Sequence, residues 1–170
     1  MTRLDFLVRP TVEDDWPQVK ALRLEMLADT PLAYLETLDS ARDHADDFWR
    51  RRAAGGWGEQ GINLVAIAAD GRWLGTMACR IFDGAVEPYL VGVYVAPAAR
   101  GAAAGVTDAL LTAIEEWAST MASGLLLDVH EDNAAARRAY AKRGFVETGR
   151  TIPYPLDPRS RELQMRKSLR

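Results

Sequence analysis

Apolar positions recur with two different periods along the chain, and the changes of period predict where helices and strands lie. A spacing of three to four residues indicates an amphipathic helix, whereas alternation or a short continuous apolar run indicates a strand. The helical spacing predicts helices over residues 14–28, 37–54, 105–121 and 133–143. The other patterns predict strands over residues 4–9, 62–69, 73–82, 89–95, 125–129, 145–151 and 161–168.

Turn and capping residues set several of these boundaries. Asp14 is predicted to cap the first helix, because Pro17 then falls in the first turn, where its missing N–H costs nothing. Gly55 ends the second helix, and the pair Asp70 and Gly71 predicts a hairpin between two strands. Three prolines predict an extended link between the last two strands: Pro153, Pro155 and Pro158.

The order of the predicted elements is strand, two helices, three strands, helix, strand, helix and two strands. Antiparallel hairpins followed by a strand–helix–strand crossover produce a mixed sheet with helices on both faces. The sequence therefore predicts the α/β (α+β) class, with a mixed, mostly antiparallel sheet of six to seven strands flanked by four helices. A length of 170 residues fits a single domain over residues 1–170.

The composition is that of a folded globular domain, with 48% hydrophobic and 26% charged residues. A formal net charge of −3 gives no general electrostatic reason to bind nucleic acid or an anionic membrane. No stretch approaches the ~20 apolar residues of a membrane span, and the first five residues lack the apolar run of a signal peptide. We therefore expect a cytoplasmic protein with no membrane or nucleic-acid partner.

The cysteines and histidines limit metal and redox chemistry. Cys79 is the single cysteine, so it can form neither an internal disulfide nor a zinc cluster, which suits a reducing cytoplasm. His44 and His130 are the two histidines, which excludes a three-histidine metal site. We expect no metal, and we expect Cys79 to be a small residue within a strand.

The segment after the strand over residues 89–95 offers a binding site for phosphate. It is rich in small residues up to Gly105, and an amphipathic helix follows directly. Successive N–H groups can therefore approach a ligand closely, the helix start adds partial positive charge, and Arg100 adds a full charge. Neither common nucleotide fingerprint is present. A compact strand-to-helix turn without a ligand explains the same residues, so both interpretations stay open.

A second cluster lies in the helix predicted over residues 133–143. Asn133 sits where this helix begins, and Tyr140 lies two turns later on about the same face. Taken singly, Asn133 is explained as an N-cap and Tyr140 as a core aromatic residue with a hydrogen-bonded hydroxyl.

Together these segments resemble the GCN5-related N-acetyltransferase (GNAT) family. The resemblance rests on Val93-Tyr94-Val95-x-Pro97, on Arg100-Gly101-x-x-x-Gly105, and on Asn133-x-x-Ala136-x-x-x-Tyr140-x-Lys142-x-Gly144-Phe145. The first two pieces are similar to the family's acetyl-CoA motif and the third to its following motif, and the order of elements agrees. The resemblance implies the acyl-CoA N-acyltransferase fold and an acyltransferase that uses acetyl-CoA (coenzyme A).

In that family acetyl-CoA lies where two parallel strands splay apart, which correspond here to residues 89–95 and 125–129. The resemblance implies that the backbones of Val93 and Val95 hold the pantetheine arm and that the Val93 N–H polarises the thioester carbonyl. Gly92 is a fitting place for the bulge that splays the strands. The implied coenzyme-binding residues are Val93, Tyr94, Val95, Arg100, Gly101, Ala102, Ala103, Ala104, Gly105, Val106, Asn133 and Tyr140.

Ala103 departs from the family pattern, in which the phosphate loop reads R/Q-x-x-G-x-G/A and this position is the first glycine. The backbone N–H survives the replacement, so binding is still expected. If the position needs a positive φ, alanine is strained there by ~1 kcal/mol or more and the affinity for the coenzyme falls.

The implied reaction is direct attack of a primary amine on the thioester carbonyl in a ternary complex. Tyr140 matches the family's general acid, which protonates the leaving thiolate. The amine must first lose a proton, and Glu87, just before the bulged strand, is the predicted catalytic base, acting through water. His130 is the other candidate base, because it titrates in the useful range. A solvated Glu87 and a surface His130 are the structural alternatives.

The acceptor amine could be a small molecule, a peptide N-terminus or a lysine, and the sequence does not choose among them. Asp43, Asp46 and Asp47 could attract a cationic amine or simply form a solvated helix face. Exposed strand edges near the C-terminus leave a homodimer open. Aromatic residues that could line the acceptor pocket, or equally pack in the core, are Tyr34, Trp49, Trp57, Tyr89 and Tyr154.

Two other functions fit the same residues. A non-catalytic acyl-CoA-binding or sensor domain would use the same scaffold, although a pure binder needs no acid such as Tyr140. A different nucleotide-binding domain would use the turn over residues 100–105 for another phosphate ligand.

Overall fold

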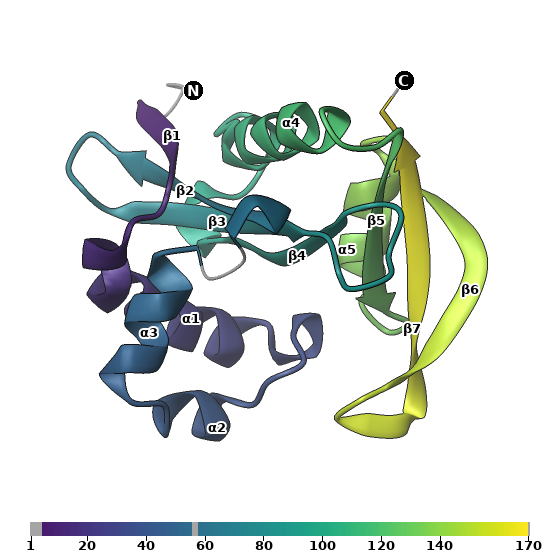
Figure 1. The fold of residues 1–170 in the computed structure, drawn as a ribbon, viewed down its shortest axis with the longest axis horizontal. Coiled ribbons are helices and arrows are strands. Elements are labelled where there is room, and N and C mark those ends of the chain that lie inside the picture. Colours follow the sequence, from purple (N-terminus) through teal and green to yellow (C-terminus); the bar gives the residue numbers. More distant parts are fainter. Residues whose placement is uncertain (1–4, 56–57, 170) are drawn as a thin grey trace.

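Seven strands form one sheet in the computed structural model, which describes residues 5–55 and 58–169 (Figure 1). The strands are β1 (Phe6–Pro10), β2 (Gly61–Ala68), β3 (Trp73–Arg80), β4 (Tyr89–Val95), β5 (Gly124–His130), β6 (Val146–Tyr154) and β7 (Asp157–Ser168). Their order is β1-β2-β3-β4-β5-β7-β6, and every described pairing is antiparallel except that of β4 with β5. The predicted mixed, mostly antiparallel sheet is confirmed. The predicted start of the first strand at Leu4 lies outside the described residues.

The described residues include five α-helices: α1 (Trp16–Asp29), α2 (Leu38–Arg42), α3 (Asp46–Ala53), α4 (Val106–Ser119) and α5 (Ala134–Ala141). The single helix predicted over residues 37–54 is two short helices, so that prediction was wrong. Between them His44 places its Nε2 2.7 Å from Oε1 of Glu36 and stacks its ring on Phe48 at 3.7 Å. These side-chain contacts hold the chain in a bend where the apolar spacing predicted continuous helix.

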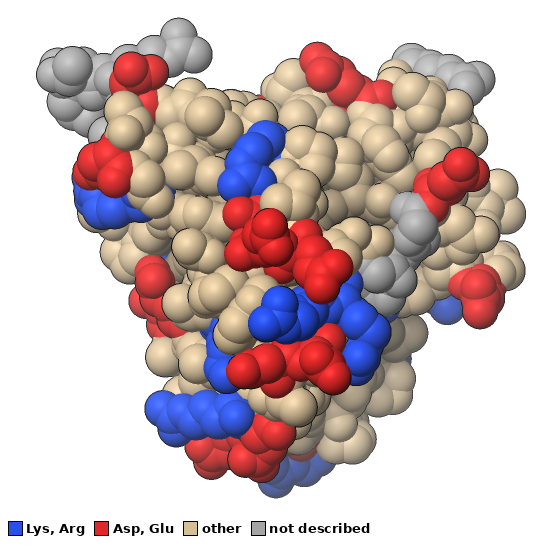
Figure 2. Space-filling model, turned by 60° about the vertical axis from the view of Figure 1, so that its left-hand side comes forward, with Lys and Arg blue, Asp and Glu red and all other residues tan. Residues whose placement is uncertain are grey.

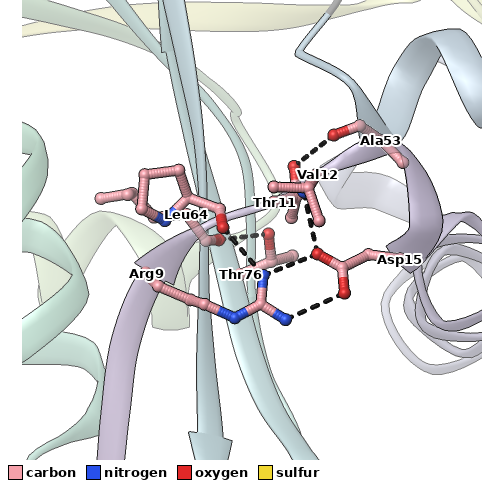
Figure 3. Close-up of polar contacts among 8 residues, drawn as sticks. Arg9, Thr11, Val12, Asp15, Ala53, Leu64 and Thr76 are labelled. Atoms are coloured by element: carbon pink, nitrogen blue, oxygen red, sulfur yellow. Dashed lines mark hydrogen bonds and ion pairs between the residues drawn. The ribbon is translucent and has the colours of Figure 1, made fainter.

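Asp15 directly precedes α1, so the prediction of Asp14 as its cap was wrong (Figure 3). The Asp15 carboxylate accepts hydrogen bonds from the Arg9 guanidinium at 2.6 and 2.9 Å and from the Val12 N–H at 2.9 Å. The bonds from Arg9 hold the pKa of this carboxyl below its ordinary value. One 3-10 turn over Glu13–Asp15 precedes α1. The carboxylate therefore joins the end of β1 to the beginning of the first helix.

The helices divide between the two faces of the sheet, and each face has its own apolar core (Figure 1). One face, called here the α1 side, carries α1, α2 and α3, and its core includes Trp49 and Tyr94. The opposite face, the α4 side, carries α4, and its core includes Leu90 and Leu110, with residues of α5 packed against it. Leu90 and Tyr94 belong to the same strand at an even separation but point to opposite faces. A bulge between them reverses the alternation of side chains.

The last two strands are longer than predicted. β6 runs through Pro153, which pairs with Arg161, and β7 already begins at Asp157. The prediction of an extended link was therefore wrong, because these residues belong to the hairpin. β6 lies at the edge of the sheet, where the missing N–H of a proline leaves no ladder bond unmade.

The surface and the described helices add two limits on function. No helix in residues 5–55 and 58–169 is long and apolar enough to cross a membrane. Within the same residues no group of three or more metal-binding side chains comes together. On the face drawn in Figure 2, basic and acidic side chains are interspersed, so this face carries no patch of one sign.

Candidate active site

The two parallel strands part soon after they meet. β4 and β5 share one register pair, Tyr89 with Leu126, and one backbone bond runs from the Leu126 N–H to the Pro88 carbonyl at 2.9 Å. Beyond this point a cavity of about 640 Å³ opens between them. It is lined by residues 89–95 of β4 and residues 127–130 of β5, among others. The predicted splay between these strands is confirmed.

A bulge at Gly92 turns the backbone of β4 toward this cavity. In the pairing with β3, Thr76 lies opposite Tyr94 and Ala78 opposite Val91, so two residues of β4 face one of β3. Gly92 has a φ of +59°, a left-handed conformation that glycine adopts at little cost. The predicted bulge at Gly92 is therefore confirmed.

Two tyrosines hold the bulge in place. The Tyr34 hydroxyl donates to the Val93 carbonyl at 2.9 Å, and the Tyr154 hydroxyl donates to the Tyr34 carbonyl at 2.9 Å. Val93 thus already accepts one hydrogen bond, but a carbonyl oxygen has two lone pairs and can accept another. The chain of bonds links the N-terminal helices, the bulge and the last hairpin.

The small-residue turn before α4 relies on glycines at its two ends. Gly101 has a φ of +102° and Gly105 a φ of +74°, whereas no described residue other than glycine has a positive φ. Ala103 therefore carries none of the strain considered for it. The turn borders the cavity, because Arg100 on one side of it and Thr107 on the other both line the opening. The first N–H groups of α4 have no carbonyl partner within the helix and can donate to a ligand.

Arg100 and Tyr94 contribute differently from what the motif implies. The Arg100 Nε donates to the Val95 carbonyl at 2.8 Å, and its terminal nitrogen contacts the Asp29 carboxylate. A phosphate group would have to share this charge with Asp29. The Tyr94 side chain lies on the α1 side, where its hydroxyl donates to Glu25 at 2.9 Å, so its backbone faces the cleft while its ring anchors α1.

Asn133, the N-cap of α5, and Tyr140, within α5, both line the cavity. The Asn133 Oδ1 accepts from the Ala136 N–H at 3.2 Å, which leaves its amide nitrogen free to donate. Burial raises the pKa of Tyr140 above its ordinary value, so its hydroxyl is protonated at neutral pH. Its ring packs edge-on to Phe145 at 5.6 Å. Asn133 therefore caps the helix and Tyr140 packs on the core, while both also line the cavity.

Glu87 lies away from the cavity lining. Its carboxylate accepts from Nε and Nη2 of Arg166 at 2.8 and 2.5 Å, and this ion pair lowers the pKa of Glu87. The pair crosses the closed end of the cleft, where a Cβ on Gly124 would meet both side chains within 2.4 Å. These contacts favour a structural role, and the prediction of Glu87 as the base gains no support from them.

His130 is buried and lines the cavity, so it is not a surface residue. Its Nδ1 accepts from the Asp132 N–H at 3.1 Å. This bond already uses the Nδ1 lone pair within the protein. Its ring also packs edge-on to Tyr154 at 4.7 Å, so this geometry favours a packing role for His130.

Two carboxylates that the sequence analysis did not select line the same cavity: Asp128 on β5 and Glu162 on β7. Glu162 is 7% exposed, and burial, followed by the nearby Asp128 charge, raises its pKa to about 7. Burial also raises the pKa of Asp128. Asp128 pairs with Gln164, and Glu162 lies two residues from Gln164 on the same face of β7, which brings the two carboxyl groups near each other. A single acidic residue in the apolar run over residues 125–129 was the available signal for Asp128, but only strand pairing identifies its partner.

The remaining predicted acceptor-site residues divide between site and core. Tyr34 and Tyr89 line the cavity, whereas Trp49 is fully buried in the core of the α1 side. Tyr154 is buried and acts through Tyr34. Trp57 lies outside the described residues. The acidic residues proposed to attract an amine, Asp43, Asp46 and Asp47, do not line the cavity.

The cavity passes through the sheet from one side to the other. Leu127 and Val129 belong to the core of the α4 side, and Tyr140 packs against that core. Because side chains alternate along a strand, Asp128 points to the α1 side, where Glu162 also lies, alternating with Leu163 of the α4-side core. One opening therefore joins a phenol on one side of the sheet to paired carboxyl groups on the other.

Comparison with known proteins agrees with this geometry. The chain matches the model of the acetyltransferase (GNAT) family over residues 23–145. It is similar to nourseothricin acetyltransferase at 27% identity and a TM-score of 0.58, over 65% of this chain and 66% of that one, just under two thirds. A search of the curated proteins finds no match.

Two other similar structures align with this chain over almost their whole length. A GCN5-related N-acetyltransferase from Kribbella flavida shows 25% identity and a TM-score of 0.72, over 96% of this chain and 97% of that one. The yncA protein of Salmonella typhimurium, solved with its cofactor acetyl-CoA, shows 20% identity and a TM-score of 0.75, over 98% and 95%. With the family match extending from α1 to the end of the Tyr140 motif, the chain belongs to the acetyltransferase (GNAT) family.

Proposed function

We propose that the chain is an N-acetyltransferase that transfers the acetyl group of acetyl-CoA to a primary amine by direct attack in a ternary complex. The observation that carries this proposal is one continuous cavity through the sheet, with Tyr140 on the α4 side and Glu162 on the α1 side. Such an opening lets a donor and an acceptor approach the same point from opposite faces. Tyr140 would then act as an acid toward the donor, and Glu162 as a base toward the acceptor.

The residues on the α4 side fit coenzyme A. Beyond Tyr89, β4 has no strand partner on the side of β5, so its edge can pair with an extended pantetheine arm. The backbones of Val93 and Val95 would hold that arm, and the N–H groups of residues 101–106 would hold the diphosphate. Alanines 135, 136 and 139 line the cavity and leave room for it. Bound acetyl-CoA supplies an activated acetyl thioester, as the complex of the yncA protein illustrates for this fold.

The residues of the chain then handle two protons. Glu162, ionised above a pKa of about 7, accepts a proton from the ammonium form of the acceptor. The freed amine nitrogen forms a bond to the acetyl carbon as the carbon–sulfur bond breaks. Tyr140 donates its hydroxyl proton to the departing sulfur, and the Val93 N–H donates to the carbonyl oxygen during the transfer.

Replacing Tyr140 with phenylalanine tests the proposal, because it removes the acid and keeps the ring. We expect kcat to fall roughly 100-fold to 10,000-fold with an unchanged calorimetric affinity for acetyl-CoA. Thiol release with a panel of amines measures the first quantity. Tyr89→Phe, which alters a cavity-lining hydroxyl bonded to Gln164, is the matched control.

Two results would contradict the assignment. Binding of acetyl-CoA without thiol release for any amine would favour the acyl-CoA-binding or sensor domain. Thermal stabilisation by ATP or NAD but not by acetyl-CoA would favour a different nucleotide-binding domain, since stabilisation follows occupancy.

A further inference from the structure

Three arginines line the α1 side of the same cavity: Arg23 from α1, Arg52 from α3 and Arg80 from β3. They come from elements far apart in the sequence, and nothing in the transfer of the acetyl group itself uses them. Guanidinium groups are always charged in proteins and bind carboxylate or phosphate oxygens in pairs. An anionic group is therefore the kind of ligand that these arginines would bind.

Arg23 and Arg52 carry more positive charge than the carboxylate beside them balances. Arg23 pairs with Glu36 at 2.9 Å, and the same carboxylate is also bonded to His44 at 2.7 Å. No carboxylate of residues 5–55 and 58–169 lies within ion-pair distance of Arg52. The charges that act on Arg52 come from Arg23, Glu36 and Arg80. One carboxylate thus serves the guanidinium groups of both Arg23 and Arg52.

Arg52 is held in position by its backbone. The Asn63 side chain donates to the Arg52 carbonyl at 3.1 Å, and the Thr11 hydroxyl donates to the adjacent Ala53 carbonyl at 2.8 Å (Figure 3 shows the second bond). Burial, followed by the like charge of Arg23, lowers the pKa of Arg52 to about 10, so it remains charged at neutral pH. A desolvated cation beside other cations costs stability, and an anion bound beside it would recover that cost.

The cavity also contains the opposite charge. Asp128 and Glu162 line it from β5 and β7, while Arg80 lies on β3, on the far side of β4. The α1 side of the opening is therefore positive at one end and acidic at the other. The outer face in Figure 2 shows mixed charges, so this separation belongs to the cavity and not to that surface.

We propose that the acceptor is a small amine that also carries an anionic group, with amino acids as the chemical class. The arginine cluster would bind its carboxylate, and the acidic end would receive its amine. This inference rests on the proposed function and deepens it. A cavity of about 640 Å³ shared with the donor favours a molecule of this size over an acidic peptide segment. A phosphonate or phosphinate group offers the same anionic oxygens, so the test includes aminophosphonates beside the amino acids.

The experiment compares matched acceptors on the full-length protein. Amino acids of increasing chain length are paired with the corresponding amines that lack the carboxylate, and with aminophosphonates. We expect kcat/KM to favour the anionic member of at least one pair by 10-fold or more. In Arg52→Gln that preference should fall roughly 10-fold to 100-fold through KM, as expected for losing a charged hydrogen-bond partner.

Arg51→Gln is the matched control, because Arg51 is an exposed neighbour on the same helix and does not line the cavity. It should keep the preference. Equal kcat/KM for anionic and plain amines in the wild-type protein would overturn the proposal, as would an unchanged preference in Arg52→Gln. Preference for peptides with acidic residues over every amino acid would also overturn it.

A binding measurement separates this inference from the proposed function. N-acetylated amino acids, the products of the reaction, should raise the melting temperature of the wild-type protein more than the corresponding N-acetyl amines do. This measurement uses the wild-type protein alone, so it depends neither on turnover nor on whether a variant folds. If acetyl-CoA binds and no amine is acetylated, the enzymatic proposal fails but the anion site is still tested. If no N-acetyl amino acid stabilises the protein, the anion site fails, whatever the activity.

Discussion

The two sides of the cavity are built in different ways. On the α4 side, the bulge at Gly92, the turn over residues 101–105 and Tyr140 lie close together in the sequence and follow a strand–helix–strand–helix unit. On the α1 side, Arg23, Arg52 and Glu162 come from α1, α3 and β7. The first side offers backbone groups and small residues, whereas the second offers charged side chains. Under the proposed function, the backbone-built side would bind the coenzyme and the charged side would select the acceptor.

Replacing Glu162 with glutamine should have the largest effect on the charged side. The change keeps the shape and removes the base, so we expect kcat/KM to fall roughly 100-fold to 1,000-fold. In the wild-type protein the low-pH limb of the activity profile should centre near the Glu162 pKa of about 7. Steady-state rates between pH 5 and 9 measure both quantities.

The same variant has a stability readout. The folded pKa of Glu162 lies above its unfolded value, so the folded protein binds this proton more tightly and loses stability as the pH rises from about 4.5 to about 7. Glu162→Gln should therefore melt at a higher temperature than the wild-type protein at pH 8, with little difference at pH 4. The exposed Glu116→Gln serves as control. Full activity in Glu162→Gln would remove it as the base.

A smaller effect is expected at Glu87, which the structure places in an ion pair at the closed end of the cleft. Glu87→Gln should keep kcat within about 3-fold and lower the melting temperature by roughly 1–4 °C, as for a partly exposed ion pair. A double-mutant cycle with Arg166→Gln would assign the loss to the pair. A 100-fold loss of kcat with intact stability would instead restore Glu87 as the base.

The smallest effect is expected at Ala103, in the turn on the backbone-built side. Because Ala103 does not have a positive φ, Ala103→Gly relieves no strain there. Its calorimetric affinity for acetyl-CoA should stay within about 2-fold of that of the wild-type protein. An affinity gain of 10-fold or more would show that the position changes conformation when the coenzyme binds.

Much of the fold could be predicted from the sequence, because local periodicity reports which side of an element is buried. The hairpin at Asp70 and Gly71, the strand over residues 89–95 and the helix that begins with Asn133 all follow such signals. Predictions failed where contacts outside the local stretch, or the position of a strand in the sheet, decided the conformation of the backbone. His44 bending the chain toward Glu36 is one case, and the edge position that allows Pro153 in a strand is another.

The sequence by itself determined the order of the strands, the bulged strand and the small-residue turn before α4, because each is encoded within a short stretch. Only the tertiary structure decided which charges face the cavity. Pairing β5 with β7 places the half-buried Asp128 near the buried Glu162, and packing α1 and α3 on the sheet brings Arg23 and Arg52 to Arg80. Burial and mutual distance set the pKa of a carboxyl and the strength of a guanidinium site, and neither quantity is local in sequence.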